Sequence, residues 1–208
     1  LSSLGDSITC QCDSGILLYQ PVTPLFRHIL QLSEIPTPMT STGPQFRTDV
    51  LTGQQIIVAP QRSRRPSARL SDPPLNPLLD PFAEGREHET PDERFSVRTG
   101  DSVPNGPGWL VRVVPNRYPA VLSASEQRTA SCVVSDQSLF PGRPACGEHD
   151  VVIECPDSRT RMVELSVAEI RQTLVAWQTR MRQLMQSSSI CSVAVFRNEG
   201  FSAGASLA

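Results

Sequence analysis

The stretch "SVAEIRQTLVAWQTRMRQLM", from Ser166 to Met185, decides the fold because it has the pattern of a capped amphipathic helix. Ser166 is placed as the helix cap, and Glu169, three residues on, can complete a capping box. Large apolar residues then recur at spacings of four, three, four and three, as one face of an α-helix requires. They are Ile170, Leu174, Trp177, Met181 and Leu184. The sequence therefore predicts one long helix whose apolar stripe packs against a sheet.

Short apolar and β-branched runs lie on both sides of this helix in the chain. The predicted strands are residues 53–60 ("GQQIIVAP"), 109–116 ("WLVRVVPN"), 149–156 ("HDVVIECP"), 161–165 ("RMVEL") and 190–198 ("ICSVAVFRN"). The third and fourth are expected to pair as a hairpin across "PDSRT". Residues 61–108 are so rich in Pro, Arg, Asp and Gly that they favour a long loop without regular elements. Strands, a helix and a further strand favour an antiparallel α+β domain with one main packed helix over a doubly wound fold.

The first part of the chain differs in character from the rest. Residues 1–38 contain short apolar pieces and several prolines but no sustained period, and a pattern begins only at Met39. We therefore expect residues 1–38 to be a poorly patterned N-terminal extension that adds little to function. Residues 39–208 are expected to form the domain.

Composition and charge exclude several classes of protein. The chain has 208 residues, 38% of them hydrophobic and 19% charged, which is typical of a globular protein. Its formal net charge of −2 gives no general attraction to nucleic acid or to anionic lipid. No run approaches the roughly 20 apolar residues of a membrane-spanning helix, and the N-terminus lacks the features of a signal peptide. The 6 cysteines form no CxxC pair. We expect a cytoplasmic protein with mostly free thiols and no nucleic-acid or membrane partner.

Two short segments have the composition of anion sites. "APQRSRRP" places Arg62, Arg64 and Arg65 directly after a predicted strand, where guanidinium groups could hold phosphate oxygens in a bidentate manner. A solvated basic surface is the alternative, and it is the commoner role of such a cluster. "GFSAGAS", near the end of the chain, could turn backbone N–H groups toward an anion, although such stretches are more often simple turns.

Six blocks in order carry a resemblance to a known family. They are "RTDVLTGQQIIVAPQRSRRP", "DPFAEGREHETP", "WLVRVVPNRYPAV", "GEHDVVIECPD", "AWQTRM" and "VFRNEGFSAGAS". Over about residues 46–208 the chain resembles the N-terminal half of galactose-1-phosphate uridylyltransferase and its nucleotidyltransferase relatives in the histidine-triad superfamily. The resemblance implies a histidine-triad-like α+β domain. It also implies UDP-sugar and sugar 1-phosphate as partners, and a homodimer is a candidate assembly for a full-length protein.

The resemblance also implies a chemical mechanism. In the family, a histidine of an H-x-H element attacks the α-phosphate of the sugar nucleotide, and a second substrate then takes the nucleotidyl group from that histidine. Imidazole suits this task because it is nucleophilic when neutral and leaves well once protonated. That element follows the "GAS" loop after two more residues, which here are Leu207 and Ala208, and the histidines of this chain form no H-x-H. The expected nucleophile thus lies beyond Ala208, and we expect the 208-residue polypeptide to be inactive alone.

Binding roles can be carried over position by position. Arg62 and Arg65 match a basic pair that contacts the phosphates of the nucleotide. Asn116, with Arg117 beside it, matches an Asn near the nucleoside. The phosphate loop is matched by Asn198, Gly204, Ala205 and Ser206. Without the resemblance, Asn116 would be interpreted as a turn residue before Pro119, and Asn198 as a residue that ends a strand.

The metal site of the family is altered in this sequence. Family members commonly bind zinc with the cysteines of a C-P-F-C segment, a histidine of a G-x-H segment and the first histidine of H-x-H. Here the first segment reads Asp80-Pro81-Phe82-Ala83, so His149 and Asp80 are the remaining ligand candidates. Structural zinc requires four N or S ligands. We therefore expect no cofactor, and we expect His149 to be hydrogen-bonded and packed beneath the site.

Three functions stay open at this point. The first is a UDP-hexose-1-phosphate uridylyltransferase. The second is a nucleotidyltransferase or phosphorylase of the same superfamily that acts on an ADP-sugar or a dinucleoside polyphosphate, because the blocks do not specify the base. The third is a non-catalytic nucleotide-binding remnant.

Overall fold

The computed structural model describes residues 15–19, 43–65, 80–129, 142–159 and 161–199, and of residues 15–19 and 127–129 it describes the backbone alone. The main sheet has the strand order β4-β5-β7-β1-β8, and each neighbouring pair in it is antiparallel. Its strands are β1 (Gly15–Tyr19), β4 (Phe95–Arg98), β5 (Trp109–Pro115), β7 (His149–Ile153) and β8 (Ser192–Phe196). With one long helix, this is the antiparallel α+β architecture that the sequence predicts.

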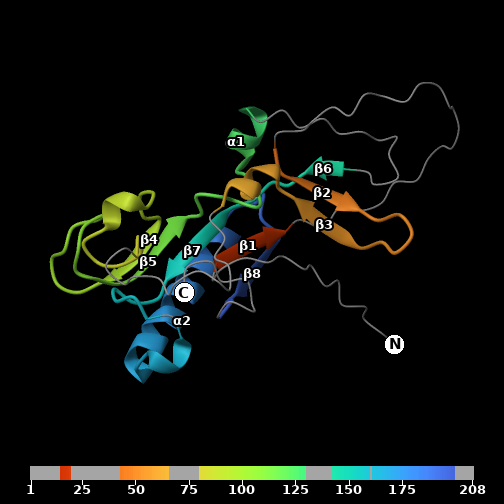
Figure 1. Ribbon diagram of the computed structural model, residues 1–208. Helices are drawn as coiled ribbons and strands as arrows, with labels where there is room; N and C mark the ends of the chain where they lie inside the picture. The colour runs from red at the N-terminus through yellow and green to blue at the C-terminus, as the bar shows by residue number, and fades with distance from the viewer. Residues whose placement is uncertain (1–14, 20–42, 66–79, 130–141, 160, 200–208) are drawn as a thin grey trace, which may run out of the picture.

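A second, smaller sheet has the order β3-β2-β6 and lies to the right of the main sheet in Figure 1. Its strands are β2 (Gln45–Thr48), β3 (Gln55–Val58) and β6 (Gly142–Pro144). The helical elements are α1 (Ala124–Thr129), α2 (Val167–Met185) and the 3-10 turns η1 (Pro60–Arg64), η3 (Glu87–Glu89) and η4 (Met162–Glu164). Within the described part of the chain, no helix is both long and apolar enough to cross a membrane.

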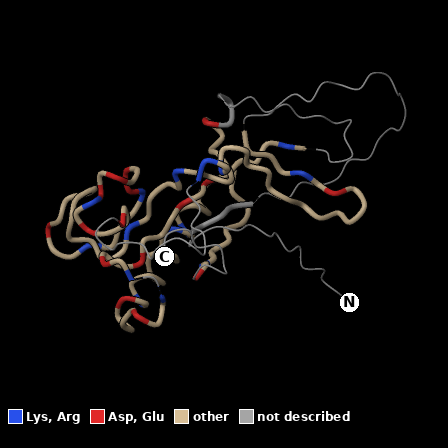
Figure 2. Tube along the Cα trace, in the orientation of Figure 1, with Lys and Arg blue, Asp and Glu red and all other residues tan. Residues whose placement is uncertain are grey.

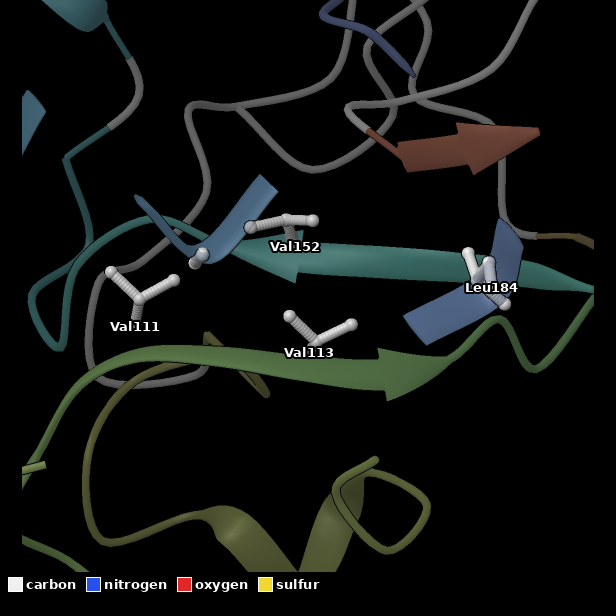
Figure 3. Close-up of a cluster of buried hydrophobic side chains, with 5 residues drawn as sticks. Val111, Val113, Val152 and Leu184 are labelled. Carbon is white, nitrogen blue, oxygen red and sulfur yellow. The ribbon is translucent and has the colours of Figure 1, made fainter. Parts of the chain in front are cut away.

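Helix α2 begins as the sequence predicts. The Ser166 hydroxyl accepts a hydrogen bond from the Glu169 backbone N–H at 3.3 Å, and the Glu169 carboxylate accepts one from the Ser166 N–H at 2.7 Å. The core beneath the helix consists of Val111 and Val113 of β5, Val152 of β7, and Ala176 and Leu184 of α2, as Figure 3 shows. The helix thus covers one face of the main sheet.

The predicted apolar stripe of α2 is wrong at Leu174, which is 49% exposed. The prediction is confirmed at Leu184, which is buried, and at Trp177, which packs against the same core, whereas Thr173 and Ala176 are buried outside the predicted stripe. Thr173 donates a hydrogen bond to the Glu154 carbonyl, which satisfies its hydroxyl group. A polar residue can therefore lie between α2 and the main sheet, where the apolar pattern predicts only large apolar side chains. The orientation of the helix therefore depends on small and polar contacts that an apolar pattern does not detect.

Alternation along β7 gives its two faces different surroundings. Val152 packs in the core beneath α2, and Asp150 accepts a hydrogen bond from Arg180 of α2 at 2.8 Å. Val151 and Ile153 pack in a separate cluster with Trp109 and Val114. Because successive side chains of a strand point to opposite faces, His149 lies on the face away from α2.

Three other expectations differ from the structure. Residues 161–165, predicted as a strand, contain the turn η4. The N–H groups of Glu164 and Leu165 donate to the Arg161 and Met162 carbonyls, so these backbone groups bond locally rather than in a strand ladder. Residues 61–108, predicted as a loop, contain η1, η3 and β4.

Strand β1 lies within residues 1–38 and pairs with both β7 and β8, so this part of the expected extension belongs to the main sheet.

Two smaller results complete the comparison with the sequence. The strands expected at 53–60, 109–116, 149–156 and 190–198 are present with shorter bounds. Cys155 is a free thiol, as predicted, and Cys10, Cys12 and Cys132 lie outside the described residues. Phe46 of β2, Ala120, Val121 and Ala145 form a core that Phe196 of β8 also contacts. The two sheets therefore meet near residues 120 and 121.

Candidate functional site

A tight turn follows β5 at the junction of the two sheets. The backbone N–H of Asn116 donates to the His149 carbonyl at 2.8 Å, and the Asn116 side-chain oxygen Oδ1 accepts from the Tyr118 N–H at 2.8 Å. Asn116 thus holds the turn that precedes Pro119, as its local sequence suggests. We refer to residues 116–120 as the Asn116 turn.

His149 lies beneath this turn and is only 4% exposed. Its Nδ1 accepts a hydrogen bond from the Ala120 N–H at 2.9 Å, and its Nε2 lies 3.2 Å from the Asn116 side-chain nitrogen Nδ2. Burial, together with the positive charges of Arg62 and Arg65, lowers the pKa of His149 to about 3. The imidazole is therefore neutral near pH 7 and contacts the Asn116 turn through both nitrogens.

The basic segment after β3 contacts the same turn. Arg62, in η1, donates from Nη1 to the Tyr118 carbonyl at 2.5 Å. Arg62 and Arg65 are half-buried and close enough to influence His149, whereas Arg64 is exposed. Acidic and basic residues are otherwise interspersed along the described chain, as Figure 2 shows. Two arginines beside a neutral histidine thus form a local basic site on a chain with a net charge of −2.

The structure does not bring every predicted binding residue to this place. Arg117 is exposed. Asn198 follows β8, and β7 and β1 lie between β5 and β8 in the sheet. The Asn198 side-chain nitrogen is buried and has no hydrogen-bond partner among the described residues. Gly204, Ala205 and Ser206 lie outside the described residues. The site that the structure supports thus consists of Arg62, Arg65, the Asn116 turn and His149.

Sequence reasoning missed two parts of the site. The Tyr118 carbonyl and the Ala120 N–H are backbone groups, so no side-chain pattern identifies them. The signal available was Pro119 in "PNRYPA", which indicates a turn but not its partners.

A sequence-family comparison identifies the family. The family described as "galactose-1-phosphate uridyl transferase, N-terminal domain" matches residues 34–208. The chain belongs to this family. The match starts four residues before the boundary at 38 that the sequence predicts and runs to the last residue given.

Two curated relatives of this family domain carry different names and share different fractions of its sequence. An ADP-glucose phosphorylase of Arabidopsis thaliana is 34% identical over 169 residues, which cover 79% of this chain and 46% of that protein. A galactose-1-phosphate uridylyltransferase of Cryptococcus neoformans is 26% identical over 164 residues, which cover 77% of this chain and 42% of that protein. The chain therefore spans less than half the length of these relatives.

A solved structure also matches. The crystal structure of an ADP-glucose phosphorylase from Arabidopsis thaliana with bound ADP-glucose has 34% sequence identity and a TM-score of 0.48, and the match covers 79% of this chain and 46% of that one. The family and its histidine-triad relatives, predicted from six blocks of sequence, are thus confirmed by the family match and the curated relatives.

The zinc site of the family does not fit the residues present. Asp80 Oδ1 accepts from the Phe82 N–H at 2.9 Å, and the Ala83 N–H donates to the Asp80 carbonyl at 3.2 Å, so the segment closes on itself as a turn. Phe82 packs against Trp109, Val114 and Ile153. Across the residues that the structure places, no three His, Cys, Asp or Glu side chains are grouped to hold a metal ion. Ala83 offers no ligand atom, and the Nδ1 lone pair of His149 already accepts from the Ala120 N–H.

Proposed function

We propose that this domain binds a sugar nucleotide as part of a nucleotidyl transferase or phosphorylase, with Arg62 and Arg65 at the phosphates and Asn116 near the nucleoside. The observation that carries the proposal is the hydrogen bond from Arg62 to the Tyr118 carbonyl, because it joins the basic segment to the Asn116 turn. Guanidinium groups suit phosphate oxygens, with which they form charge-assisted bidentate contacts.

The described residues are assigned to binding and orientation rather than to bond making. A nucleophilic histidine must present a free ring nitrogen to the phosphorus atom. His149 is 4% exposed, and both of its nitrogens face nitrogen atoms of the Asn116 turn. His88 is an exposed residue beside Glu89, and His28 lies outside the described residues. Because the 208-residue sequence contains no H-x-H, we expect this polypeptide to bind sugar nucleotide without transferring the nucleotidyl group.

An ADP-sugar is our first candidate substrate. The six sequence blocks favour a UDP-sugar through the resemblance that they carry, but the relative named ADP-glucose phosphorylase is 34% identical to this chain, against 26% for the relative named galactose-1-phosphate uridylyltransferase. A UDP-sugar stays the second candidate because the matching family carries the uridyl transferase description. Inorganic phosphate would accept the nucleotidyl group in a phosphorylase, and a sugar 1-phosphate would accept it in a uridylyltransferase.

Calorimetric titration of the 208-residue chain tests the proposal. We expect saturable binding of ADP-glucose, weaker binding of UDP-glucose, and little binding of glucose 1-phosphate, which lacks the nucleoside and one phosphate. Tighter binding of UDP-glucose would reverse the order of the two candidates. Absence of binding by both sugar nucleotides would contradict the proposal.

A further inference from the structure

Hydrogen-bond donors outnumber acceptors where His149 meets the Asn116 turn. The Ala120 N–H points at Nδ1 of the ring, and the Tyr118 N–H points at Oδ1 of Asn116. Backbone N–H groups can only donate, so these contacts fix the ring nitrogen and the amide oxygen as acceptors. A neutral imidazole has one acceptor nitrogen and one N–H. With Nδ1 accepting, the ring proton of His149 must lie on Nε2.

The contact that remains then joins two donors. Nε2–H of His149 faces the amide nitrogen Nδ2 of Asn116 at 3.2 Å. Exchanging the oxygen and nitrogen of the amide does not help, because Nδ2 would then face the Tyr118 N–H. Moving the ring proton to Nδ1 does not help either, because it would then face the Ala120 N–H. Protonating the ring would add a donor, and the lowered pKa of His149 keeps it neutral.

An acceptor atom from outside the protein would satisfy both groups at once. The two nitrogens are 3.2 Å apart, so one oxygen can lie about 2.9 Å from both of them, which is the usual N···O distance of an N–H···O hydrogen bond. Asn116 is half-buried and His149 beneath it is buried, so such an atom would have to approach from the side of Asn116. The charges of Arg62 and Arg65 act on the same ring and favour an anionic oxygen.

We propose that His149 Nε2 and Asn116 Nδ2 form a paired donor that binds one oxygen of the phosphate attached to the nucleoside of the ligand. The pairing makes His149 a direct ligand contact that requires no metal, although the resemblance assigns this position to zinc. The assignment of the ligand rests on the proposed function, whereas the meeting of two donors rests on the geometry of this chain alone.

Nitrogen-15 NMR of the histidine rings tests the pair directly. Replacing the other two histidines, as in His28→Gln with His88→Gln, leaves His149 as the only ring signal. We expect Nδ1 without a proton and Nε2 with one. Addition of saturating ADP-glucose or UDP-glucose should move the Nε2–H proton resonance downfield, because the proton gains an acceptor. A proton on Nδ1 would overturn the donor pair.

The isosteric change Asn116→Asp gives a second, independent test. The new carboxylate oxygen would accept from Nε2–H while the other still accepts from the Tyr118 N–H. We expect the melting temperature to rise by about 2 °C or more, a readable shift for a chain of this size, while affinity for the sugar nucleotide falls about tenfold or more through charge repulsion. A fall in melting temperature would contradict the donor pair.

Attraction to Arg62 and Arg65 could also stabilise Asn116→Asp, so the change is repeated in a His149→Asn background. Asn at 149 can still accept from the Ala120 N–H but has no atom at the Nε2 position. The stabilisation by Asn116→Asp should shrink in that background if the donor pair is its cause, and an unchanged gain would overturn the pair.

The outcomes separate this inference from the proposed function. Binding of sugar nucleotide without a change at Nε2–H would overturn the paired contact and leave the proposed function intact. Binding of neither ADP-glucose nor UDP-glucose would overturn the proposed function and the ligand assigned to the pair.

Discussion

Replacing Arg62 tests the link between the basic segment and the Asn116 turn. Arg62→Ala removes the proposed contact to a phosphate, which as a charge-assisted hydrogen bond contributes about 1.5–3 kcal/mol. The dissociation constant for the sugar nucleotide should therefore rise about tenfold to somewhat over a hundredfold. Arg62→Lys keeps the charge but loses the planar guanidinium, so its loss should be smaller. Calorimetric titration of each variant measures the change.

The same substitution should also affect folding. Arg62 donates to the Tyr118 carbonyl at 2.5 Å, and that bond is lost in Arg62→Ala. A net loss of about 1 kcal/mol corresponds to a melting temperature lower by about 2–4 °C in a chain of this size. From the sequence alone, Arg62 would be treated as an exposed loop residue with little effect on stability. The structure changes that expectation because the side chain is half-buried and hydrogen-bonded.

Arg64→Ala is the matched control because Arg64 lies in the same turn but is exposed. It should leave both the affinity and the melting temperature nearly unchanged. If Arg64→Ala weakens binding as much as Arg62→Ala, the segment acts as a diffuse positive surface and the assignment to individual residues is wrong. If none of the arginines matters, the proposed phosphate contacts do not exist.

Four further outcomes are expected. Metal analysis of the purified chain should find no stoichiometric zinc, and a tightly held zinc would show that Asp80 and His149 meet ligands we have not placed. Glu93→Gln should lower the free energy of unfolding, measured in urea, by about 3 kcal/mol. The reason is that Arg112, whose side chain is 1% exposed, loses its buried ionic partner. A loss below about 1 kcal/mol would show that this ion pair is dispensable. Folding lowers the pKa of His149 from 6.5 to about 3, so between these pH values the unfolded chain binds more protons than the folded chain. The free energy of unfolding should therefore fall as the pH drops from about 6.5 toward 3, and it should fall less steeply in His149→Asn. Equal slopes would show that His149 is not buried in its neutral form. Sugar-nucleotide exchange assays should detect no transfer by the 208-residue polypeptide, and measurable turnover would show that a residue within it acts as the nucleophile.

Local signals in the sequence predicted part of the fold well. The capping box of α2 could be predicted because Ser166 and Glu169 stabilise the helix start over three residues, independent of the rest of the chain. The orientation of α2 could not, because it depends on partners distant in sequence. Arg180 faces the sheet to reach Asp150, and Thr173 faces it to reach the Glu154 carbonyl, so Leu174 turns outward.

The candidate site was predicted only through the family resemblance. Arg62 and the Asn116 turn are more than fifty residues apart, and they meet through the carbonyl of Tyr118, a group that every residue has. Spacing and composition therefore could not bring them together. Strands β4 and β1 were missed because of the sequence around them: β4 lies in the segment rich in Pro, Arg, Asp and Gly, and β1 lies in the poorly patterned first part of the chain. The boundary at residue 38, the cytoplasmic location, the homodimer and the phosphate loop at Gly204, Ala205 and Ser206 stay predictions.

A crystal structure of the 208-residue chain with ADP-glucose or UDP-glucose would locate the bound phosphates. We expect them to contact Arg62 and Arg65, with one phosphate oxygen between Asn116 Nδ2 and His149 Nε2. A cavity of about 310 Å³ lies beside α2, and Arg94, Glu148 and Arg180 form part of its lining. Phosphates bound in that cavity and absent from the Asn116 turn would show that the phosphate contacts assigned to Arg62, Arg65 and His149 are wrong.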